Sequence, residues 1–237
     1  MKLPTSFPLF VLLVGLLTVS CEDEHTGTPE FSYAFILADS INWTVDYADY
    51  PPSDPDLYEL ESKFTTLPAP LDTTQPALLI SGANRSDDLF MYAKRKLTGL
   101  PPRQPLTVAV EATFASNAAS NAVGIGGPPG ESVYLKTGVT REEPVATPDD
   151  MGWLRLNIDK GNQSQIGTQA LSLGNAANGT DEFVYVLLDR KTEGELVVEP
   201  DENGEAWFYI GSDSGFEGTT SLYYHRVSIT LRPVEGE

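Results

Sequence analysis

The residues best suited to bind a ligand form an aromatic and acidic cluster near the start of the chain. Trp43, Asp46, Tyr47, Asp49 and Tyr50 lie close together, just before a proline-rich stretch. Flat aromatic faces stack on sugar rings, and carboxylates accept hydrogen bonds from hydroxyl groups. The cluster therefore predicts a carbohydrate-binding surface. The alternative is that Trp43 and some of the tyrosines belong to the hydrophobic core.

A second candidate is the glycine-rich stretch from Gly211 to Thr220, which carries Phe216 near its middle. Glycine frees the backbone to curl, and Asp213 with Glu217 offers the hard oxygen ligands that Ca²⁺ prefers. The spacing does not follow the pattern of an EF-hand loop. We therefore expect a shaped connection between two strands in which Phe216 rims a binding site. The alternative is a purely structural turn.

Catalytic arrangements are sparse in this sequence. Its two histidines are His25 near the N-terminus and His225 in an apolar row with Val227 and Ile229, and no Gly-x-Ser-x-Gly motif is present. A histidine in such a row is typical of a hydrogen-bonded core residue. Paired carboxylates among the 34 acidic residues leave a glycosidase or polysaccharide lyase open. Binding is nevertheless favoured over catalysis.

The charge of the chain excludes one class of partner. It carries 34 acidic against 15 basic residues, a formal net charge of −19. Such a surface repels phosphate backbones, so we expect no nucleic-acid partner. The stretch Gly124–Ser132 is rich in glycine, but Pro128 and Pro129 remove N–H donors that a phosphate-binding loop needs. Nucleotide binding is therefore not expected either.

The hydrophobic pattern predicts an all-β fold. Leu106 to Phe114 alternates apolar and polar residues over one strand length, and so does the stretch Tyr223–Leu231. Leu89–Leu97 fits a strand as well as a helix, and we interpret it as a strand. Many short strands separated by glycine and proline predict two packed antiparallel sheets, a β-sandwich of jelly-roll type, in a single domain.

Two segments resemble known modules. Lys96-Leu97-Thr98-Gly99-Leu100-Pro101-Pro102 resembles a strand–turn–strand step of galactose-binding-like and carbohydrate-binding modules, and Leu222–Ile229 is similar to their closing strand. The resemblance implies a jelly-roll domain that binds carbohydrate. His225 stands near a position where those modules often carry an aspartate that helps hold calcium, so the resemblance does not extend to that site.

The N-terminus predicts the location of the protein. Lys2 precedes an apolar run from Phe7 to Val19, which is too short to span a bilayer and is typical of a secretory signal. Small residues before Cys21, the only cysteine, resemble the lipobox of bacterial lipoproteins, in which that cysteine is acylated. This implies palmitate or a similar acyl chain on Cys21 and a place in the bacterial cell envelope, periplasmic or at the surface. An ordinary secreted protein with a leftover thiol is the alternative.

These observations divide the chain into four parts: a signal peptide over 1–20, an acidic tether over 21–30, a β-sandwich over 31–233 and a disordered tail over 234–237. We expect a lipid-anchored envelope protein that binds carbohydrate at Trp43, Asp46, Tyr47, Asp49, Tyr50 and Phe216. A structural envelope lipoprotein that docks on another protein is the second hypothesis, and a jelly-roll glycosidase or lyase is the third.

Overall fold

We describe the protein from a computed structural model, which covers residues 29–38, 41–53 and 55–234. The predicted signal peptide, Cys21 and nearly all of the predicted tether lie outside these residues, as do residues 235–237. The described chain forms fourteen strands and one 3₁₀ helix, η1 (Pro55–Tyr58). The strands are β1 (Phe31–Ile36), β2 (Thr44–Ala48), β3 (Glu61–Thr66), β4 (Pro76–Ala83), β5 (Leu89–Leu97), β6 (Leu106–Ser116), β7 (Val133–Thr140), β8 (Ala146–Pro148), β9 (Leu154–Leu156), β10 (Leu171–Asn175), β11 (Val186–Lys191), β12 (Val197–Val198), β13 (Ala206–Ser214) and β14 (Thr219–Pro233).

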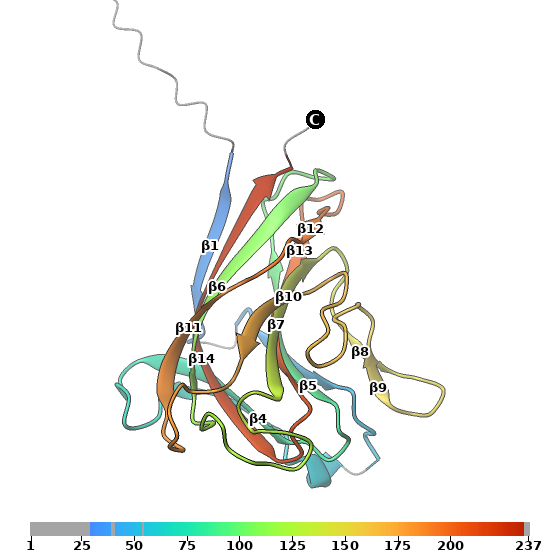
Figure 1. Cartoon of the computed structure of the whole chain (residues 1–237). Coiled ribbons are helices and arrows are strands. Elements are labelled where there is room, and N and C mark those ends of the chain that lie inside the picture. Colours follow the sequence, from blue (N-terminus) through green and yellow to red (C-terminus); the bar gives the residue numbers. More distant parts are fainter. Residues whose placement is uncertain (1–28, 39–40, 54, 235–237) are drawn as a thin grey trace, which may run out of the picture.

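Two antiparallel sheets pack face to face (Figure 1). The seven-stranded sheet has the order β11-β6-β14-β4-β3, with β1 also pairing with β14 and β12 with β6. The five-stranded sheet has the order β10-β7-β13-β5-β2. Inward-facing side chains of both sheets form one large core, to which Phe114, Phe208 and Ile229 contribute fully buried side chains. The prediction of an antiparallel β-sandwich of jelly-roll type is confirmed.

The strands with the clearest alternation were predicted correctly. β6 places Leu106, Val108 and Val110 in the core, as its period of two requires. β5 confirms the choice of a strand for Leu89–Leu97. Each of these strands is central in its sheet, where one face must be apolar, so the pattern is strong.

The face assignment of the last strand needs a correction. The register of β14 against β6 shifts between Tyr224 and Arg226, which is a β-bulge at His225. Because the extra residue reverses the alternation, Tyr224 rather than Tyr223 joins Val227 in the core. His225 is buried, and its Nδ1 lies 2.7 Å from the Pro76 carbonyl oxygen, as expected for a hydrogen-bonded core histidine.

The β8–β9 hairpin covers the outer face of the five-stranded sheet. Phe90, Tyr92 and Tyr209 form a buried cluster on that face, and Ala146 and Leu156 of the hairpin strands pack against it. The Phe90 and Tyr92 rings are stacked, with centroids 5.2 Å apart. These three aromatic side chains are therefore closed off from solvent.

β14 runs between the two ends of the sandwich, from Thr219 at one end to Pro233 at the other. β1 pairs with its final residues, so Phe31 lies opposite Leu231 and both described ends of the chain meet at one end (Figure 1). At about 3.3 Å per residue, the fifteen-residue strand places Thr219 about 45 Å from that end. Within the described part of the chain we find no helical segment with the length and apolar character that a membrane crossing requires.

Candidate functional site

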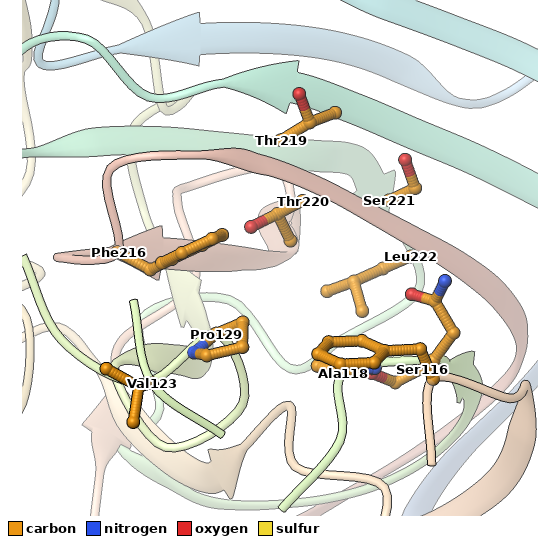
Figure 2. Close-up of a pocket in the computed structure, with 11 residues that line it drawn as sticks. Ser116, Ala118, Val123, Pro129, Phe216, Thr219, Thr220, Ser221 and Leu222 are labelled. Atoms are coloured by element: carbon orange, nitrogen blue, oxygen red, sulfur yellow. The ribbon is translucent and has the colours of Figure 1, made fainter. Parts of the chain in front are cut away.

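A cavity of about 210 Å³ lies at the Thr219 end of the sandwich (Figure 2). One wall is the arch, the four residues Gly215–Gly218 that carry the chain from β13 in one sheet to β14 in the other. The other walls come from the loop between β6 and β7 and from the segment before β11. We call it the arch cavity, and it is lined by Ser116, Asn117, Ala118, Val123, Pro129, Phe183, Phe216, Thr219, Thr220, Ser221 and Leu222.

Phe216 projects from the arch beside this cavity, and two glycines make room for its ring. A Cβ atom added at Gly124 would lie 2.6 Å from Cε2 of the Phe216 ring, and one at Gly218 would clash with Cζ. Side chains essentially never approach that closely, so both positions require glycine for as long as the ring keeps its place. The glycines of the sequence therefore act here by close packing rather than by flexibility.

Hydrogen bonds hold the arch on both sides. The buried Asn84 side chain donates from Nδ2 to the carbonyl oxygens of Ser214, at 2.7 Å, and Phe216, at 3.2 Å. On the other side, Gly215 N donates to Ser132 O and Glu217 N donates to Ile125 O, both in the segment that joins β6 to β7. The arch is thus a fixed wall.

The polar chemistry of the arch cavity comes from hydroxyl and amide groups alone. None of its eleven lining residues carries a charge, although the chain has a net charge of −19. The Thr220 hydroxyl is buried and has no hydrogen-bond partner in the described structure, and Figure 2 shows it turned toward the Phe216 ring. A buried polar group without a partner costs free energy, so a new hydrogen bond to this hydroxyl would be favourable. The oxygen has almost no exposed surface, so a ligand reaches it only when neighbouring side chains move.

Of the six predicted ligand residues, Phe216 lines the arch cavity and the other five do not. Trp43 and Tyr50 are buried in the core, where the Trp43 ring packs edge-on against Phe208 and Tyr50 packs against Tyr58. The expectation of exposed rings at these two positions is wrong, because both side chains pack in the core. Trp43 also lines a pocket at the surface together with Trp207.

The remaining three predicted residues are engaged in contacts within the fold. Asp46 accepts hydrogen bonds from its neighbour Tyr47 N and from the Tyr92 hydroxyl. Burial raises the pKa of the half-buried Tyr47 to about 12. Asp49 is buried and lies 2.9 Å from both the Arg155 guanidinium and the Lys160 ammonium group. These carboxylates therefore bond to the protein itself.

Asp49 belongs to a network of charged side chains that connects the five-stranded sheet to residues 155–160. Two of its members, Lys136 and Asp213, have fully buried side chains and form an ion pair of 2.8 Å. Lys136 also donates to the carbonyl oxygens of Lys160 and Gln165, so all three ammonium hydrogens have acceptors. The network consists of Asp49, Asp88, Lys136, Arg155, Lys160 and Asp213.

The network does not suit a divalent cation. Asp49, Asp88 and Asp213 offer carboxylate oxygens within 4.8 Å of one another, but Oδ2 of Asp213 already accepts from two lysine ammonium groups. A metal ion there would lie beside those two positive charges. Glu217, the other predicted Ca²⁺ ligand, is exposed and is absent from this carboxylate group. The geometry gives Asp213 an ion-pairing role.

Burial and neighbouring charges shift the protonation of this network. Burial, together with the nearby Asp213 carboxylate, raises the pKa of Asp88 to about 7. Burial alone would raise the pKa of Asp213 as well, but Lys160 and Lys136 outweigh it and lower that pKa. At neutral pH, Asp213 is therefore ionised, while Asp88 changes its protonation state.

Comparisons with known proteins give no family. A scan against models of protein families finds no match, and neither does a search of curated proteins. Among solved structures, the chain resembles the CBM22-1 xylan-binding domain of Xyn10C from Paenibacillus barcinonensis, at 9% identity and a TM-score of 0.39, with 86% of this chain and 95% of that chain covered. A cyclase from Fischerella sp. TAU is similar at 13% identity and a TM-score of 0.37, covering 86% and 90%. TmCBM61, solved with β-1,4-galactotriose, is similar at 10% identity and a TM-score of 0.33, covering 82% and 91%.

The arch cavity must be interpreted from its own residues, because these similarities are too weak to transfer a function. The sequence pointed to Phe216 through the glycines around it. It did not single out Thr220, although this residue ends the same glycine-rich stretch, and it did not single out Phe183, which reaches the cavity from a distant part of the sequence. Val123 and Phe183, which also line the cavity, carry no local pattern that marks them as site residues.

Proposed function

We propose that this protein is a lipid-anchored binding protein of the bacterial envelope, and that the arch cavity takes up neutral carbohydrate. Phe216 and Phe183 offer apolar ring surface, and Thr219, Thr220 and Asn117 offer hydroxyl and amide groups. Sugars present this same combination of apolar C–H faces and hydroxyl groups. With no cation in the lining and a strongly acidic chain around it, an anionic ligand is disfavoured.

The observation that carries the proposal is the unpartnered Thr220 hydroxyl beside the Phe216 ring in an uncharged cavity. A ligand hydroxyl that reaches this oxygen, once neighbouring side chains move aside, would recover the hydrogen bond that the fold leaves unmade. The volume of about 210 Å³ lies below the range of about 300–1,000 Å³ that is usual for small-molecule pockets. Recognition of a single sugar residue or a chain end is therefore favoured over a long chain.

Binding is favoured over catalysis at this cavity. Its lining contains no carboxylate, histidine, lysine or cysteine, the side chains that most often transfer protons or attack substrates. A ligand held here would therefore be bound without being cleaved. An assay for released reducing ends, run on every polysaccharide that binds, tests this part of the proposal.

Calorimetry against a panel of neutral and acidic sugars, alone and as oligosaccharides, tests the binding itself. We expect neutral sugars to bind and uronic acids not to bind. Phe216→Ala should abolish the binding, whereas Trp43→Phe should leave it unchanged provided that the variant folds. A panel without any response, or responses that survive Phe216→Ala, would contradict the proposal.

The lipid anchor forms the other half of the proposal. Because β1 begins at the end of the sandwich opposite the arch, an acyl chain on Cys21 would leave the arch cavity facing away from the membrane. Acyl chains hold a protein at a bilayer through about 0.8 kcal/mol per buried CH₂. Cys21→Ser should therefore move the protein into the soluble fraction, and a variant that still sediments with membranes would refute the anchor.

A further inference from the structure

Three large apolar side chains are strongly exposed at the same end of the sandwich. Val123 is 99% exposed, Ile125 is 72% exposed and Phe183 is 68% exposed. Two of them, Val123 and Phe183, line the arch cavity. The third is held beside the arch, because the Ile125 carbonyl oxygen accepts a hydrogen bond from Glu217 N at 2.8 Å. We call these three residues the apolar rim.

The exposure of the apolar rim indicates that a ligand binds there. Single exposed apolar residues are common on soluble proteins, but neighbouring ones around a cavity mark a binding surface. The rim is continuous with a cavity that contains an unpartnered hydroxyl and no charge. One ligand could therefore meet both surfaces, provided that it has a polar part and an apolar part.

We infer that the ligand of the arch cavity is a neutral sugar that carries an apolar substituent, and that the apolar rim covers this substituent. The sugar ring lies against Phe216 with a hydroxyl directed to Thr220, and the substituent lies over Val123, Ile125 and Phe183. An O-alkyl or O-acyl group on the sugar has this chemistry. The inference rests on the proposed function, because it assigns the sugar to the same cavity.

Binding measurements with matched glycosides test the inference. Each neutral hexose and pentose of the panel is compared with its methyl and butyl glycosides by calorimetry. We expect affinity to rise from the free sugar to the methyl and then the butyl glycoside, by about fourfold for each CH₂ group that the rim buries completely.

Substitutions separate the rim from the rest of the surface. Ile125→Ser should reduce the gain from the butyl group while leaving the affinity for the free sugar nearly unchanged, because Ile125 does not line the arch cavity. Phe183→Ser, at a residue that also lines the cavity, should lower the ratio of the butyl glycoside affinity to the free-sugar affinity. Met151→Ser is the matched control, because Met151 is 83% exposed and lies in the turn between β8 and β9, outside the lining of the arch cavity. It should leave both affinities unchanged.

The possible results are distinguishable. Equal affinity for free sugars and glycosides, or a butyl gain that survives Phe183→Ser, would overturn the inference while leaving sugar binding intact. Absence of binding for every sugar and every glycoside would overturn the proposed function itself. Self-association in sedimentation experiments that disappears in Phe183→Ser would show that a second copy of the chain covers the rim, and this would also overturn the inference.

Discussion

The Lys136 ammonium group lies 2.8 Å from the Asp213 carboxylate, and neither side chain has any exposed surface. β7 and β13 are neighbours in the five-stranded sheet, and Lys136 is adjacent to Gly211 in their register. The absence of a side chain at Gly211 leaves the backbone close to Tyr92, where an added Cβ would lie 2.7 Å from the Tyr92 Cβ. The ion pair therefore holds Asp213 in the last residues of β13, directly before the arch begins at Gly215.

Removing one partner of this ion pair should be costly. Lys136→Met leaves Asp213 with one ammonium group in the protein interior, and breaking a buried pair in this way typically costs about 3–5 kcal/mol. Unfolding by urea measures the loss. Lys191→Met is the matched control, since its pair with Glu111 is exposed to solvent and contributes little to stability. Equal effects of the two substitutions would contradict a structural role for the network.

Asp88 should make the stability of the protein depend on pH. Its pKa is about 7 in the folded protein and about 3.9 in an unfolded chain, so the folded state binds this proton more tightly. The stabilisation is therefore complete below about pH 4 and is lost as the pH rises toward 7, by at most about 1.4 kcal/mol per pH unit.

Measurements of unfolding free energy between about pH 5 and about pH 8 isolate this contribution, because the lowered pKa of Asp213 affects stability only at more acidic pH. Asp88→Asn should flatten the dependence. Asp87→Asn, an identical change of charge at the exposed neighbouring residue, should retain it. A slope that persists in Asp88→Asn would assign the titration to another group.

Thr220→Val should separate stability from binding. Valine has nearly the shape of threonine but no hydroxyl, so the substitution removes a buried polar atom that has no partner. We expect the free energy of unfolding to rise by about 1 kcal/mol. Affinity for the sugar should fall at the same time, because its hydrogen bond is lost. A variant that is less stable, or that binds equally well, would refute the role given to this hydroxyl.

Gly218→Ala should destabilise the protein through the Phe216 ring. The added methyl group would overlap the ring, and such overpacking costs about 1–3 kcal/mol. In a Phe216→Ala background the same substitution should cost much less, since the obstacle is gone. A double-mutant cycle measures this coupling, and independent effects would show that Gly218 is required for another reason.

Sequence analysis predicted the central strands well and the polar ones poorly. Alternation identified β6 because one of its faces must be apolar. The sequence did not reveal β2 as a strand. Asp46 and Tyr47 do not follow an alternation of apolar and polar residues, so the segment looked like a cluster on the surface. The stretch Gly211–Ser214 looked like a loop, yet it is the end of β13. Its polar residues are tolerated in a strand because Lys136 and Lys160 neutralise Asp213.

The candidate site was predictable only in part. Phe216 stood out between glycines, and it does lie at the cavity. Trp43 stood out equally in the sequence. A single tryptophan does not show whether its ring will be buried. In the structure, Phe35 and Phe208 pack against the Trp43 ring. That Thr220 lacks a partner follows from the packing of distant segments, which no local pattern records.

The most direct test of the account is calorimetric titration of the protein and of Thr220→Val with neutral sugars under the same conditions. The account predicts saturable binding to the protein and, at undiminished stability, binding weaker by about tenfold for the variant, the loss of about one hydrogen bond. Equal affinity of the two proteins for the same sugar would place the ligand elsewhere and contradict the central claim.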